Sequence, residues 1–165
     1  MSEAATTMLS EEVCREIDHW LTKFPGERKQ SAVIPALSAA QEHNAGHLSE
    51  ELMDAVAAYL DMPRVSVYEV ATFYSMYNLK PVGKYVINVC TNISCMLMGS
   101  DGIVAHLENK LGIKMGETTA DNKFTLKIEE ECLAACAGGP MMAINGHYYE
   151  KLSAEELDRI LDNLD

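Results

Sequence analysis

The stretch KYVINVCTNISC, residues 84–95, combines a short apolar run with two cysteines that have four residues between them. Apolar side chains fall on both faces of residues 84–90, which is typical of an internal β-strand. Cys90 therefore ends a strand, and Cys95 lies in the connection that follows it. The rest of the chain determines what this pair of thiols does.

A second predicted strand also leads into a pair of cysteines. In FTLKIEE, residues 124–130, the apolar residues Phe124, Leu126 and Ile128 alternate with polar residues, and we expect the polar ones to face outward. Cys132 and Cys136 follow. A helix expected over 101–111, with Ser100 as its N-cap, supplies the crossover of a parallel strand pair. Both strands then end at one edge of the sheet, where Cys90, Cys95, Cys132 and Cys136 converge.

Four converging cysteines suit a metal centre, because thiolates bind both zinc and iron. The spacings C-x4-C and C-x3-C are compatible with one tetrahedral Zn²⁺ or with a [2Fe–2S] cluster. The loops TNIS and LAACAGG are small and let backbone N–H groups approach the sulfurs, which favours iron–sulfur. Zinc and unligated thiols remain open alternatives on the residues alone. Cys14, far from the other four, is expected to be a partly buried thiol on a helix.

Composition narrows the functional class. The chain has 165 residues and a net charge of −12, which argues against binding nucleic acid or an anionic membrane surface. We expect no secretory signal, no direct membrane insertion and a cytoplasmic location, where structural disulfides are rare. No glycine-rich phosphate loop precedes a helix in the required context, so we expect neither NADH nor flavin to bind this chain.

The two parts of the sequence have different periodicities. Residues 1–79 predict an N-terminal helical bundle, and its last helix is expected to begin at a capping box formed by Ser66 and Glu69. Residues 80–165 predict an α/β domain with the thioredoxin-like order β-α-β-β-β-α. Its last three elements are a hairpin with an Asn145–Gly146 turn and a helix capped by Ser153. Pro140 is a candidate for the cis-proline of such folds.

The segment VYEVATFYSMYNLKPVGKY, residues 67–85, precedes the first cysteine pair. Residues 96–131 separate it from the second pair, and GGPMMAINGHYYEKLS follows at 138–153. This pattern resembles the family of the E subunit of bacterial NADH–quinone oxidoreductase, respiratory complex I. The resemblance implies a thioredoxin-like [2Fe–2S] ferredoxin whose ligands are Cys90, Cys95, Cys132 and Cys136. The chain departs from the family at Ala134, where glycine is common.

The resemblance also implies a function. The chain would be a non-catalytic electron-carrier subunit, with NADH and FMN bound by a partner. That partner would be the flavin- and NADH-binding subunit of complex I, and the large iron–sulfur subunit would be a second neighbour. The expected location is the peripheral arm of an inner-membrane complex, on its cytoplasmic side. The alternatives are a structural zinc-binding interaction module and a stand-alone thioredoxin-like ferredoxin.

Overall fold

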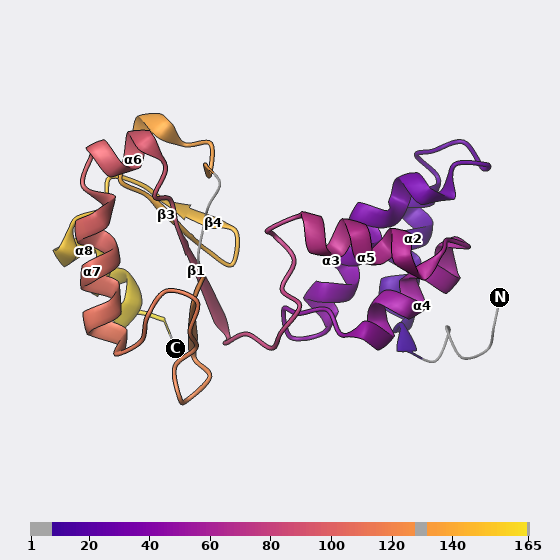
Figure 1. The fold of residues 1–165 in the computed structure, drawn as a ribbon, viewed down its shortest axis with the longest axis horizontal. Helices are drawn as coiled ribbons and strands as arrows, with labels where there is room; N and C mark the ends of the chain where they lie inside the picture. Colours follow the sequence, from indigo (N-terminus) through magenta and orange to yellow (C-terminus); the bar gives the residue numbers. More distant parts are fainter. Residues whose placement is uncertain (1–7, 128–131, 165) are drawn as a thin grey trace. The chain divides into compact units, whose positions relative to one another are not determined.

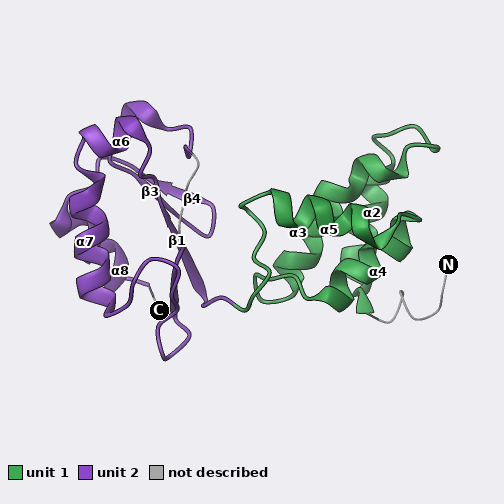
Figure 2. Cartoon of the chain, in the orientation of Figure 1, with its two compact units in different colours: residues 1–81 green, residues 82–165 purple. Residues whose placement is uncertain are grey.

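A computed structural model describes residues 8–127 and 132–164 of the chain. The chain forms two compact units, Met1–Pro81 and Val82–Asp165, which are coloured separately in Figure 2. The expected division into independent domains over 1–79 and 80–165 stays a prediction. Within the described ranges, no helix has both the length and the apolar character needed to cross a bilayer.

The first unit is built from helices whose starts follow their capping residues. The hydroxyl of Ser10 accepts a hydrogen bond from the N–H of Val13 at 3.2 Å, and that of Ser49 accepts one from Leu52 at 3.3 Å. Serine suits both sites because its side-chain oxygen satisfies an N–H that has no partner in the first helical turn. The elements are α2 (Glu11–Leu21), η1 (Lys29–Ala32), α3 (Val33–His43), α4 (Glu50–Leu60) and α5 (Arg64–Phe73).

The predicted start of the last helix in this unit is wrong. Helix α5 begins at Arg64 with Pro63 as its N-cap, so Ser66 lies inside the first turn and its N–H bonds the Pro63 carbonyl at 3.0 Å. Proline at the start of a helix lacks only an N–H that would have no helical partner, and its fixed φ suits the entry. Pro63 therefore separates α4 from α5 and initiates α5 as well.

Small side chains allow the helices of the first unit to pack closely. Its core combines buried alanines of α3 and α4 with larger residues such as Ile17 and Leu37. The irregular segment after α5 is held to α3 by polar contacts. The Tyr77 hydroxyl donates to the Ile34 carbonyl at 2.8 Å, and the N–H of Asn78 donates to Gln41 Oε1 at 2.7 Å.

The second unit is a four-stranded sheet in the order β2-β1-β3-β4. Strands β1, β3 and β4 are labelled in Figure 1. Strand β1 pairs in parallel with β2, and β3 pairs antiparallel with both β1 and β4. The expected β-α-β-β-β-α order and α/β class are confirmed, with a short additional helix after β1. The elements are β1 (Tyr85–Val89), α6 (Ile93–Leu97), α7 (Ser100–Leu111), β2 (Phe124–Lys127), η2 (Cys136–Gly138), β3 (Met142–Ile144), β4 (His147–Tyr149) and α8 (Ala154–Asp162).

Helices α7 and α8 cover one face of the sheet. Leu107 and Leu157 are fully buried with Ile87 and Leu126 in the core of this unit. The turn between β3 and β4 has positive φ at both Asn145 and Gly146, as the type I′ prediction requires. The capping serine of α8 is also confirmed, because Ser153 Oγ accepts the N–H of Glu156 at 3.2 Å.

Two details of this unit differ from expectation. Gly99, with φ +97°, is the N-cap of α7, and Ser100 is instead the first, buried residue of the helix. Thr125 was expected to face solvent, but it is buried because its Oγ1 accepts the N–H of Gly83 at 2.7 Å and lies 2.8 Å from Thr118 Oγ1. Residues 128–130 of the predicted strand lie outside the described residues.

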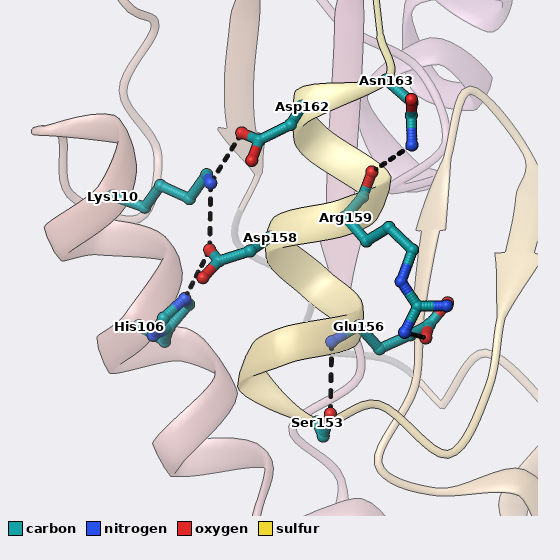
Figure 3. Close-up of polar contacts among 8 residues, drawn as sticks. All are labelled: His106, Lys110, Ser153, Glu156, Asp158, Arg159, Asp162 and Asn163. Atoms are coloured by element: carbon teal, nitrogen blue, oxygen red, sulfur yellow. Dashed lines mark hydrogen bonds and ion pairs between the residues drawn. The ribbon is translucent and has the colours of Figure 1, made fainter.

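A polar network joins the outer surfaces of α7 and α8, as Figure 3 shows. Asp158 Oδ1 lies 2.8 Å from His106 Nε2 and 3.0 Å from Lys110 Nζ, and the same Nζ lies 2.7 Å from Asp162 Oδ1. The hydrogen bond from His106, supported by Lys110, holds the pKa of Asp158 below its ordinary value. The network therefore stabilises the contact between the two helices when Asp158 is ionised.

We expect Asp158→Asn to lower the unfolding midpoint of the chain at neutral pH. A carboxylate with a lowered folded pKa contributes stability above its unfolded pKa of about 3.9, and this contribution disappears as pH falls through the folded value. The difference from the unsubstituted chain should therefore vanish in acid. Thermal unfolding across pH measures it. The matched control is Asp101→Asn, at an exposed residue of α7. If Asp158→Asn lowered the unfolding midpoint at neutral pH no more than Asp101→Asn does, the role of the network would be contradicted.

Candidate metal centre

The first pair of cysteines is buried at the edge where β1 ends. Cys90 follows Val89 directly, and its N–H donates to the Met141 carbonyl at 3.1 Å, which joins the end of β1 to the start of β3. Cys95 lies in α6, whose first N–H, from Ile93, donates to Asn92 Oδ1 at 2.8 Å. Each of the two cysteines is only 1% exposed, and they pack together with Met141.

The second pair is on the surface of the same unit. Cys132 and Cys136 are exposed, and their Sγ atoms lie 3.3 Å apart. Ala134 allows the chain to turn between them, with φ +60°, and its N–H donates to Cys132 Sγ at 3.3 Å. The left-handed conformation costs a residue with a Cβ about 1–2 kcal/mol, which explains why glycine suits this position in the family that the sequence resembles.

Contacts between side chains connect the two pairs. Hydrogen bonding with Cys95 and with Cys132 helps to lower the pKa of Cys90, so this thiol interacts with both pairs. The hydroxyl of Ser94, in α6, donates to the carbonyl of Cys136 at 3.3 Å and so joins the two cysteine loops. The structure thus brings the four predicted ligand residues together, as the parallel strand pair requires. Their binding to a metal stays a prediction.

Backbone N–H groups point at the sulfurs. Backbone hydrogen bonds from Leu133 and Asn92 act to lower the pKa of Cys90, and one from Met141 acts to lower that of Cys95. With the Ala134 contact, three of the four sulfurs accept such bonds from other residues. Hydrogen bonds to sulfur stabilise thiolates and help to set the reduction potential of iron–sulfur centres. This donor pattern matches the expectation from the small residues of the two loops.

The thiols differ in acidity because they interact with one another. Burial alone would raise the pKa of Cys90, but the hydrogen bonds from Leu133, Asn92, Cys95 and Cys132 outweigh it and lower this pKa. Burial, followed by the hydrogen bond and charge of Cys90, raises the pKa of Cys95 to about 11. The hydrogen bond and charge of Cys132 raise the pKa of Cys136. Neighbouring thiolates therefore oppose one another, and a bound cation is the natural compensation.

The segment before β3 approaches the buried pair closely. A Cβ placed on Gly139 would lie 3.2 Å from Cys95 Sγ and 2.9 Å from Met98 Sδ. The Gly139–Pro140 peptide is cis, which confirms the expectation for Pro140. The glycine in GGP was recognisable from the sequence as a point of close approach. Ser94 gave no such signal, because its partner is a carbonyl 42 residues away.

The fifth cysteine is separate from this cluster. Cys14 lies in α2 and is half-buried against the core of the first unit, as expected. Burial raises the pKa of its thiol, although a hydrogen bond with Tyr59 opposes the rise. A thiol with a raised pKa is a weak nucleophile and a weak metal ligand at neutral pH. Cys14 is therefore a structural residue.

We expect Gly139→Ala to weaken iron retention. The added methyl group would press on Cys95 Sγ, and overpacking of this kind costs about 1–3 kcal/mol, or about 5- to 150-fold in affinity. Met98→Ala in addition would remove the clash with Met98 but not the one with Cys95, so it should not restore binding. Iron per chain after gel filtration against a chelator measures the effect.

The matched control is Gly102→Ala in α7, where an added Cβ meets nothing within 4 Å. This variant should hold iron like the unsubstituted chain and gain slightly in stability, because alanine favours a helix. Equal iron retention in the Gly139 and Gly102 variants would show that the close approach at Gly139 is unimportant.

Comparisons with known proteins agree with this arrangement. Residues 17–165 match the family model described as thioredoxin-like [2Fe-2S] ferredoxin. The E subunit of the NADH-quinone oxidoreductase of Rickettsia felis is 51% identical over 142 residues, which cover 86% of this chain and 84% of that one. The mitochondrial NADH dehydrogenase [ubiquinone] flavoprotein 2 of Dictyostelium discoideum is 44% identical over 90% of this chain and 60% of its own length.

A solved structure shows the same fold in a longer protein. An NAD+-reducing [NiFe]-hydrogenase aligns with a TM-score of 0.65 at 20% identity, over 78% of this chain and 22% of that one. At this identity the similarity concerns the fold alone. The family match covers nearly the whole chain, and the family implies an iron–sulfur cluster. The chain therefore belongs to the thioredoxin-like [2Fe–2S] ferredoxin family and is related to the E subunit of NADH–quinone oxidoreductase.

Proposed function

We propose that Cys90, Cys95, Cys132 and Cys136 hold one [2Fe–2S] cluster, and that the chain is a single-electron carrier of an NADH dehydrogenase complex. The observation that carries the proposal is the meeting of two thiol pairs at one sheet edge, with backbone N–H donors aimed at the sulfurs. The family match supports the choice of cluster.

The pairwise arrangement favours a two-iron centre over zinc. In a structural zinc site, all four sulfurs occupy the corners of one tetrahedron around a single ion. Here Cys90 and Cys95 form a buried pair, while Cys132 and Cys136 form an exposed one. Two irons, each held by two cysteines, fit this arrangement.

The proposed ligand set determines the kind of function. A bound [2Fe–2S] cluster accepts and releases one electron at a time. Four cysteines fill the coordination positions that the protein supplies, so a substrate has no open position on the metal. The chain would hold the cluster, aim N–H groups at its sulfurs and exclude water from Cys90 and Cys95, which are buried. Oxidation of NADH would need a partner subunit that binds NADH and FMN.

An apolar surface beside the centre supports docking of such a partner. In α6, Ile93 is 69% exposed and Leu97 is 78% exposed, and both belong to the same short helix as the ligand residue Cys95. Exposed apolar groups that gather in one place mark interaction sites. The proposed occupant is the flavin- and NADH-binding subunit, with the large iron–sulfur subunit as a second neighbour. The complex would lie in the peripheral arm on the cytoplasmic side of the inner membrane.

Metal analysis tests the ligand set. Anaerobically purified chain should contain about two irons and two sulfides, absorb in the visible range and give an electron-spin signal after reduction with dithionite. Serine in place of Cys95 or Cys136 should remove most of the iron, whereas Cys14→Ser should retain it. A colourless protein with one zinc per chain would contradict the proposal and favour the zinc-binding interaction module.

Leu97→Asp tests the docking surface. This variant should keep its cluster and its reduction by dithionite but lose at least about tenfold in affinity for the flavin subunit, because a charge would be buried at an apolar contact. The control is Val65→Asp in α5, also an exposed apolar residue at 61% exposure. Reduction by NADH in a mixture with the flavin subunit measures the outcome. Full activity of the Leu97 variant would show that the flavin subunit docks elsewhere on the chain, whereas no complex with a flavoprotein would favour a stand-alone ferredoxin.

A further inference from the structure

The first unit carries a groove between α2 and α3 that the proposed electron transfer does not use. It has a volume of about 570 Å³, which falls within the usual range of ligand sites. Its lining is mainly apolar, from Trp20, Phe24, Ile34 and Met76, with two carboxylates from Glu16 and Glu42. Trp20, Ile34 and Met76 are 39%, 37% and 48% exposed, so the groove presents an open apolar surface to solvent.

Charge is concentrated toward one end of this groove. Glu12 Oε2, near the start of α2, lies 3.7 Å from His43 Nδ1 at the end of α3, so the two helices run in opposite directions. Glu16 and Glu42 therefore lie toward the same end, and Phe24 and Ile34 lie toward the other. Within the described ranges, neither Glu16 nor Glu42 has an ion-pair partner. The groove thus combines an acidic end with an aromatic and aliphatic end.

We propose that this groove binds a basic amphipathic helix of a partner protein. Apolar side chains of the helix would contact Trp20, Phe24 and Ile34, and a lysine or arginine would lie against Glu16 and Glu42. On α2, four residues and about 6 Å of helix separate Glu16 from Trp20, and Phe24 follows just past the end of α2 at Leu21. The partner helix would therefore carry its basic residue one to two turns from its apolar anchors.

Charge also argues against the other possible occupants. A second copy of this chain carries a net charge of −12 and would be repelled from an acidic groove. Residues 1–7 of the chain itself, MSEAATT, contain no lysine or arginine. An anionic membrane surface would be repelled in the same way. A basic amphipathic helix is the occupant that makes favourable contacts at both ends of the groove, with the carboxylates at one end and the apolar side chains at the other.

The groove contains its own reporter, because Trp20 is the only tryptophan of the chain. The probe is a synthetic helical peptide of about 15 residues built from leucine and lysine, long enough to form a helix when bound. Added to the full-length, cluster-loaded chain in about 0.15 M salt, it should shift Trp20 emission to shorter wavelength in a saturable manner. A peptide of the same pattern with glutamate in place of lysine should not.

A matched pair of variants separates specific from general attraction. Glu42→Lys reverses a charge in the groove, and Glu69→Lys reverses an exposed charge on α5 outside it. Both change the net charge equally. At this salt concentration charges beyond about 8 Å are largely screened, so Glu42→Lys should weaken binding at least about tenfold and Glu69→Lys less than about twofold.

Three results would overturn the proposal. They are the absence of a Trp20 shift, equal weakening by the two variants, and equal binding of the glutamate peptide. A concentration-dependent dimer of the unsubstituted chain that Glu42→Lys dissociates would assign the groove to a second copy instead. None of these outcomes depends on the metal, so they are distinct from failure of the proposed electron-carrier function.

Discussion

Parallel pairing between β1 and β2 is the constraint on which the rest of the second unit depends. Tyr85 pairs with Phe124 and Asn88 with Lys127, so the two strands run in the same direction and end at the same edge. The segments that follow β1 and β2 therefore both start at that edge. The antiparallel strand β3 runs back along the other side of β1, which places Met141 beside Cys90. The thiols therefore come together because of the backbone hydrogen bonds that pair β1 with β2 and with β3.

Features set by neighbours in sequence could be predicted. Ser10, Ser49 and Ser153 cap helices through N–H groups three residues away, and the Asn145–Gly146 turn depends on two adjacent residues. Predictions failed where two local signals stood side by side. Pro63 served as the stop of one helix and the start of the next, while Gly99 took the capping position that a serine beside it could have filled.

Features set by distant residues could not be predicted. Thr125 has the polar character of an outward residue, but Gly83 and Thr118 cover it. The four cysteines were identified as a group from topology, but spacing alone left zinc open. The backbone donors that distinguish the site come from Leu133 and Met141 as well as Asn92, and their directions depend on how three loops fold together. The hydrogen bond from Ser94 to the Cys136 carbonyl could not be predicted for the same reason, because its partners are 42 residues apart in the sequence.

The unequal burial of the two thiol pairs has a consequence for the lifetime of the centre in air. Cys90 and Cys95 have almost no contact with water, whereas Cys132 and Cys136 lie on the surface. In a chain that holds the proposed cluster, oxygen, peroxide and chelators would therefore approach the metal from the side of Cys132 and Cys136. Chemical damage would begin there, and a protein that covered this side would shield the metal.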